Sequence, residues 1–285
     1  MAKRKESSNN EASGSEDSAS DNEEIVNVDF DFFDFKPDID YQAIKNLLRQ
    51  TFDSDNVIFD LSALADLILS QSSLGSTVKC DGPESDPFAY LTVVNANLHR
   101  DHPALRQVID YILSKSKKNN DLSNKIRELL ADDAKTTTAL LFSERLINMP
   151  TEVVPPMYNM LLDEMKKAIQ NGEKYDFDYY IIISKSFTEI VSLIDEEDDR
   201  PKKKKKKAAQ NAKEIFYFHA EDELIMQNSE FSLVYQFSNE AQEADSKRAF
   251  QDYGIAPQGQ LMLISKQNFE KTVSEMLQMF AIPAQ

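Results

Sequence analysis

Cysteine, glycine and long apolar runs are scarce in this sequence, and each shortage excludes a class of protein. The 285 residues include six glycines and one cysteine, Cys80. Few glycines argue against the Gly-rich loops that hold phosphate groups. A single cysteine excludes an internal disulfide and a cysteine metal cluster, and it is typical of a reducing compartment. No apolar run approaches the roughly 18 residues of a membrane span, and the basic start MAKRKESSNN lacks the apolar segment of a secretory signal.

Catalytic motifs are equally scarce. The sequence contains no P-loop, no G-x-S-x-G and no H-E-x-x-H motif. His99 and His102 have no further cysteine or histidine nearby, and His219 lies in the aromatic run IFYFH. A metal site needs three or four ligands, so we interpret all three histidines as structural and expect no metal. The many carboxylates single out no pair for acid–base catalysis.

One short string matches part of an acetyltransferase. Residues 251–256, QDYGIA, fit the pyrophosphate loop Gln/Arg-x-x-Gly-x-Gly/Ala. Such a loop needs free backbone N–H groups at the start of a helix. Here Pro257 removes a donor, and the pattern predicts that a strand follows. We therefore interpret the match as accidental and expect no catalytic residue and no cofactor.

The charge of the chain is strongly negative. The net charge is −17, and without the six lysines at 202–207 it is −23. Such a surface repels nucleic acid and anionic membranes and attracts cationic partners, so we expect no direct binding to DNA or membranes. Solubility alone is the other explanation of an acidic surface.

Composition divides the chain into a tail and one domain. Residues 1–24 are rich in serine, asparagine and acids, too polar to form a core, so we expect a disordered acidic Ser-rich tail. Its serines at 13, 15, 18 and 20 lie among acids and are candidates for phosphorylation. We expect residues 25–285 to form a single globular domain, with a charged flexible insertion at about 195–212.

Hydrophobic periodicity predicts a mixture of strands and helices. The first strand is expected between residues 24 and 35, where phenylalanines alternate with acids. This mixture, without strict alternation, predicts an α+β (mixed α/β) domain in which a single sheet is flanked by helices. The other expected strands include Val78, Tyr90–Asn95, Thr136–Phe142, Tyr175–Ser184, Ile215–His219, Glu223–Met226, Phe231–Phe237 and Leu261–Ser265. The expected helices begin near Asp38 or Asp40, Asp60, Asp101, Leu122, Pro155 and Phe269; Ile169 and Leu277 are expected to face inward.

Two segments resemble transport signals. The run PKKKKKK is typical of sequences that bind the acidic groove of an import receptor, and it comprises Lys202, Lys203, Lys204, Lys205, Lys206 and Lys207. The acids immediately before it are candidates for attracting a basic client or masking the lysines; they are Asp195, Glu196, Glu197, Asp198 and Asp199. The leucine spacing of Leu61, Leu64, Leu67 and Leu69 fits either an export signal or a buried helix.

The run IVNVDFDFFDFKPDIDYQAIKNLLRQ, residues 25–50, resembles the start of the BCCIP family. The acidic tail, the lysine run and the strand FSLVYQF extend the resemblance over roughly residues 25–285. It implies a fold like that of the GNAT acetyltransferases, used as a binding scaffold. It also implies a nuclear protein, shuttling with the cytoplasm, that escorts a basic ribosomal protein of the L-fourteen type.

The resemblance leaves other functions open. Fungal members of the family are linked to nuclear export of a phosphoinositide kinase, and animal members to cell-cycle and recombination proteins. The alternatives to an escort chaperone are therefore a cell-cycle or DNA-repair adaptor and an acetyl-CoA-dependent acetyltransferase. An escort predicts a basic client and salt-sensitive binding, whereas an acetyltransferase predicts thermal protection by CoA.

Overall fold

A computed structural model describes residues 29–71, 73–190, 214–238 and 253–280. The predicted tail, 1–24, and the predicted insertion, 195–212, lie outside these ranges. Among the helices within them, none combines the length and the hydropathy needed to cross a bilayer.

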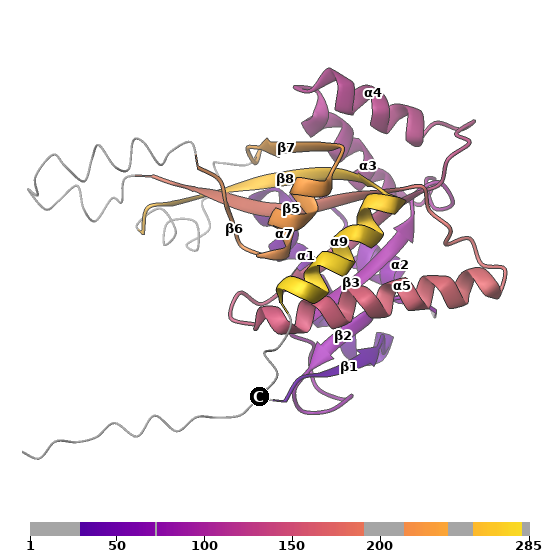
Figure 1. The fold of residues 1–285 in the computed structure, drawn as a ribbon, viewed down its shortest axis with the longest axis vertical. Helices are drawn as coiled ribbons and strands as arrows, with labels where there is room; N and C mark the ends of the chain where they lie inside the picture. The colour runs from indigo at the N-terminus through magenta and orange to yellow at the C-terminus, as the bar shows by residue number, and fades with distance from the viewer. Residues whose placement is uncertain (1–28, 72, 191–213, 239–252, 281–285) are drawn as a thin grey trace, which may run out of the picture.

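A single sheet organises the described chain (Figure 1), as the sequence predicts. Its strand order is β1-β2-β3-β4-β5-β8-β7, and β6 pairs with β5 off this path. The β4–β5 pair is parallel, and the other pairs are antiparallel. The strands are β1 (Asp31–Asp34), β2 (Ser76–Lys79), β3 (Ala89–Asn95), β4 (Thr138–Arg145), β5 (Tyr179–Glu189), β6 (Phe216–Tyr217), β7 (Phe231–Tyr235) and β8 (Ile255–Ser265).

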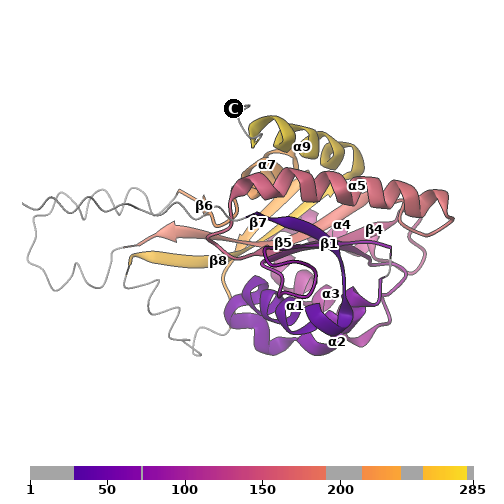
Figure 2. The same ribbon diagram turned by 90° about the horizontal axis from the view of Figure 1, so that it is seen from below.

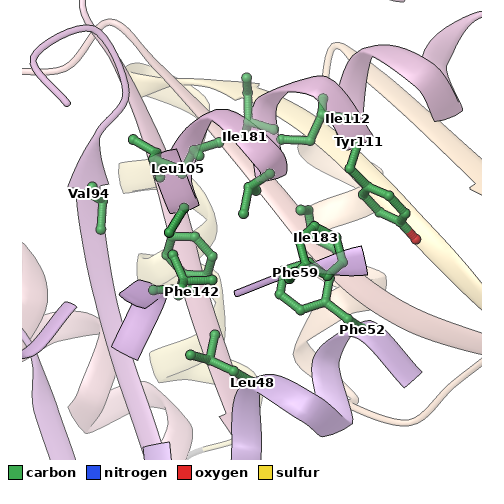
Figure 3. Packing of buried hydrophobic residues seen from close by; sticks show 14 of the residues in the cluster. Leu48, Phe52, Phe59, Val94, Leu105, Tyr111, Ile112, Phe142, Ile181 and Ile183 are labelled. Carbon is green, nitrogen blue, oxygen red and sulfur yellow. The ribbon is translucent and has the colours of Figure 1, made fainter. Parts of the chain in front are cut away.

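Helices cover both faces of the sheet, and the sheet separates the hydrophobic core into two parts (Figure 2). The first core lies under α1–α4, and Figure 3 shows part of its packing around Phe52, Phe59 and Tyr111. The second lies under α5, α7 and α9. The helices are α1 (Pro37–Phe52), α2 (Leu61–Leu69), α3 (Pro103–Ser116), α4 (Asn120–Leu129), α5 (Val154–Gln170), α7 (Glu221–Asn228) and α9 (Lys266–Met279), with the 3-10 turns η1 (Asp53–Ile58) and η2 (Thr151–Val153).

Local signals explain where the first two helices begin. Pro37 occupies the first turn of α1, where no backbone donor is needed. The Asp40 carboxylate accepts a hydrogen bond from the Lys36 N–H at 2.8 Å and so closes that turn. Asp60 caps α2 by accepting from the Ala63 N–H at 3.0 Å.

Two sequence-based expectations about these elements are wrong. Residues 223–226 form part of α7 and not a strand. The buried positions of α7 have helical spacing, but two of them, Glu221 and Asp222, are acids, and this hides the pattern from a reading based on apolar residues. Ile169 and Leu277 were expected inside, but they are 38% and 43% exposed because Ala168 and Met276 take the inward positions beside them.

Candidate functional site

Exposed carboxylates gather at the β1 edge of the sheet. Figure 2 shows β1 between α5 on one face and α1 and α2 on the other. The carboxylates come from β1 and the residues flanking it, from the first turn of α1, and from the loop between β2 and β3. We call them the acidic corner: Asp29, Asp31, Asp34, Asp38, Asp81, Glu84 and Asp86.

The contacts of two lysines bring these three segments together. Asp31 lies opposite Lys79 in the β1–β2 ladder. The Lys79 Nζ lies 2.6 Å from an Asp40 carboxylate oxygen and donates to the Pro83 carbonyl at 2.9 Å. Lys36, directly before α1, reaches Glu84 of the loop at 2.6 Å. The strand, the helix start and the loop are therefore tied at one corner.

Both lysines of the corner are already committed to carboxylates. The side chains of Lys79 and Asp40 are fully buried, so their charges cancel inside the protein. Lys36 offsets Glu84 at the surface. The remaining exposed acids give the corner a surplus of negative charge. Burial raises the pKa of the neighbouring Glu164 carboxyl, and the charge of Asp34 adds to the rise.

A second group of charges lies inside the sheet, where β4 and β5 separate. The parallel pairing covers Thr138–Leu141 against Tyr179–Ile182. Beyond it, β6 pairs with β5 at Ser186 and Phe187, and the β5–β8 ladder continues to Glu189 opposite Ile255. We call the opening between the two parallel strands the fork; the short strand β6 fills one side of it.

Glu144 is the centre of the fork. One carboxylate oxygen lies 2.7 Å from the Nε2 atom of His219, and the other lies 3.1 Å from the Lys185 Nζ. The Thr51 hydroxyl of α1 donates to the second oxygen at 3.2 Å. Arg145 pairs with Glu221. These contacts join α1, β4, β5 and the start of α7.

The fork shifts the acidity of its groups. Burial alone would raise the pKa of Glu144, but the charges of Lys185 and His219 outweigh burial and lower the pKa to about 2. Burial alone would lower the pKa of His219, but its hydrogen bond to Glu144 reverses the direction. Burial and then Glu221 raise the pKa of Asp222, to which Ser184 donates a hydrogen bond.

Clusters of shifted pKa values often mark active sites, but the geometry here favours a structural role. Glu144, His219 and Asp222 are at most 6% exposed. Their contacts join strands and helices of the same domain, which is how buried ion pairs fix an arrangement of elements. We therefore interpret the fork as a lock that holds β4, β5 and α7 together.

The shifted pKa of Glu144 predicts how stability depends on pH. Its folded value of about 2 lies below its ordinary 4.5, so its contribution of about 3 kcal/mol is present above the ordinary value and is lost as the pH falls toward 2. We expect the wild type to lose more unfolding free energy than Glu144→Gln over that range. Urea unfolding at a series of pH values measures the difference. Parallel losses in both proteins would contradict the prediction.

The residues predicted as transport or attraction sites lie outside the described ranges. They are the acids 195–199 and the lysines 202–207. The description of the chain is interrupted after Ile190, directly after β5, and resumes at Glu214, two residues before β6. The described residues that flank this gap lie at the end of the sheet where the β5–β8 ladder extends beyond β4 (Figure 1).

Other candidates have clear positions in the fold. The leucines of the export-like pattern, Leu61, Leu64, Leu67 and Leu69, are 7% exposed or less and belong to the first core. In the acetyltransferase-like string, Gly254 is followed by β8, in which Pro257 lies opposite Phe187. A strand follows as predicted, whereas a phosphate-binding loop needs a helix. His99 and His102 form the turn that leads into α3.

Sequence reasoning missed the partners of His219. It interpreted this histidine as structural, in agreement with its bond to Glu144, but it identified neither Glu144 nor Lys185. A signal was present. Lys185 follows the apolar run YYIIIS in β5, and Glu144 follows the run TALLFS in β4. Charged side chains in such strands are rarely buried unless they are paired.

Comparison with known proteins gives consistent matches. The sequence profile of the BCCIP family matches residues 25–225. Protein BCP1 of Yarrowia lipolytica is 48% identical over 260 residues, 90% of this chain and 84% of that protein. Protein bcp1 of Schizosaccharomyces pombe is 44% identical over 99% of this chain and its own full length. The crystal structure of BCP1 from Saccharomyces cerevisiae matches with a TM-score of 0.62 at 30% identity, covering 92% of this chain and 93% of that chain.

Proposed function

Because the chain belongs to the BCCIP family, we propose that it is a non-enzymatic nuclear escort chaperone for a basic protein of the large ribosomal subunit, of the L-fourteen type. The observation that carries the proposal is the acidic corner, where the local lysines are committed and surplus carboxylates face solvent. A ribosomal protein presents a surface rich in lysine and arginine to RNA. An acidic partner covers that surface and prevents wrong contacts before assembly.

The net charge of −17 supports the same proposal. Long-range attraction between oppositely charged proteins accelerates their association and makes it sensitive to salt. The acids at 195–199 add to this attraction, and the lysines at 202–207 bind the import receptor that takes the complex to the nucleus. Export of a phosphoinositide kinase is a further role that the family resemblance implies.

Capture of the client from cells tests the proposal. We expect the tagged full-length protein to retain one basic ribosomal protein at low salt, at near-equal amount, and to lose it as salt rises. Neutralising three acids of the corner is expected to reduce capture about tenfold, since each exposed ion pair contributes up to about 1 kcal/mol. The variant carries Asp31→Asn, Asp34→Asn and Asp38→Asn. Quantitative mass spectrometry measures the ratio.

A matched control separates position from total charge. The control variant neutralises three exposed acids elsewhere, Asp66, Asp110 and Asp133, and changes the net charge by the same amount. We expect it to capture the client as the wild type does; equal losses in both variants would contradict the role of the corner. Recovery of kinase or repair proteins without a basic client would favour the adaptor. A thermal shift at saturating CoA would favour the acetyltransferase.

A further inference from the structure

The acidic corner surrounds β1, which is an edge strand of the sheet. β1 pairs with β2 and, among the described residues, is the last strand on its side of the sheet. Along an edge strand, alternate residues direct their N–H and C=O groups away from the neighbouring strand. Figure 2 shows the edge between the two helical layers, with helices above and below it. β1 therefore presents main-chain donors and acceptors in a row, with carboxylates at both of its ends.

The strand is anchored firmly enough to serve as a template. Phe30 and Phe32 pack against the second core, and Phe35 packs against the first. Asp31 and Asp34, the end residues of β1, are exposed. The phenylalanines thus fix the strand between the two cores, while the acids remain available at the surface.

The opposite edge of the sheet differs in charge. β7 and the two residues after it, FSLVYQF, contain no charged side chain. Its last residues are held by Lys115, which donates to the Gln236 carbonyl at 2.8 Å and to the Ser238 hydroxyl at 2.7 Å. Only the β1 edge combines a terminal strand with a surplus of carboxylates in the described chain.

We propose that the β1 edge binds an extended, Lys/Arg-rich segment of the client by strand addition. Main-chain hydrogen bonds to β1 supply the register, and the cationic side chains meet the acids of the corner. Charge complementarity selects this occupant. A second copy of this acidic chain would place like charges across the same edge. The inference rests on the proposed escort function and names the contact that it uses.

A peptide of alternating lysine and threonine is the probe, because it is cationic and favours extended backbone. We expect the full-length protein to bind it, with at least tenfold slower hydrogen exchange at the amides of β1 in the complex. N-methyl groups on alternate residues of the same peptide keep its charges but block hydrogen bonding along one of its two edges. We expect the methylated peptide whose blocked edge is the one that pairs with β1 to bind about tenfold more weakly than the unmethylated peptide.

Two substitutions of equal charge change provide the control. Asp31→Lys lies on the β1 edge, and Glu230→Lys lies on an exposed residue directly before β7. We expect Asp31→Lys to weaken peptide binding about tenfold and Glu230→Lys to leave it near the wild-type value. Asp34→Lys, at the other end of β1, repeats the test if Asp31→Lys does not fold.

The outcomes distinguish the contact from the function. Equal binding of the methylated and unmethylated peptides, protection confined to other strands, or no peptide binding would each overturn strand addition. Capture of a basic ribosomal protein that is insensitive to Asp31→Lys would leave the escort function standing without this contact. If the wild-type protein captured no basic ribosomal protein, the escort function would be overturned, whether or not the peptide binds.

Discussion

Replacement of Glu144 by glutamine is expected to lower the free energy of unfolding by about 3–5 kcal/mol at neutral pH. The glutamine fills nearly the same space but carries no charge. It leaves Lys185, whose side chain is 14% exposed, without its partner in the fork. It also removes the negative charge that favours the charged form of His219. Urea unfolding followed by circular dichroism measures the change.

The same substitution at the surface provides the control. Glu84 forms an ion pair with Lys36, but its side chain is 70% exposed. We expect Glu84→Gln to change the free energy of unfolding far less than Glu144→Gln, because water replaces the lost partner. If both variants had similar stability, the fork would not be the lock that its geometry indicates.

Replacement of Asp40 by asparagine is expected to cost a similar amount, about 3–5 kcal/mol, because it leaves the Lys79 ammonium without a countercharge in the interior. The Asp40 and Lys79 side chains are both fully buried at a separation of 2.6 Å. The asparagine carbonyl can still accept from the Lys36 N–H, so the start of α1 is preserved and the measured loss reports the ion pair. Thermal and urea unfolding provide two independent measurements.

Two further variants test this explanation. Asp38→Asn removes an exposed acid from the same helical turn and is expected to cost less than about 1 kcal/mol. Adding Lys79→Met to Asp40→Asn removes the stranded charge and is expected to recover part of the lost stability. A double variant less stable than Asp40→Asn alone would show that the lysine contributes through its packing or its bond to Pro83, and not as half of a pair.

The sequence predicted those elements whose signals are local. The face formed by Ile44, Leu47, Leu48 and Phe52 has helical spacing, and all four residues are buried in α1. The negative charge near the first strand is also visible in the sequence, because acids alternate with phenylalanines at residues 29–35. Composition alone therefore predicted an acidic surface, for which a cationic partner and solubility were both open explanations.

The sequence could not predict which acids act together. Asp31 and Glu84 belong to one corner only because β1, α1 and the 80–88 loop are tied by Lys79 and Lys36. Glu144 and His219 are separated by 75 residues and meet only where β4 and β5 diverge. Such contacts depend on how segments far apart in the sequence pack together, and hydrophobic periodicity within a short window carries no information about that packing.

The position of β8 constrains the order in which the protein is completed during synthesis. β5 is an Ile-rich central strand at residues 179–189, yet its antiparallel neighbour β8 occupies residues 255–265. His219, which helps close the fork, also follows β5. Until the ribosome has made residues 255–265, one edge of β5 lacks its partner and can associate with other nascent chains. A protein proposed to shield others thus exposes a vulnerable strand of its own until β8 has been translated.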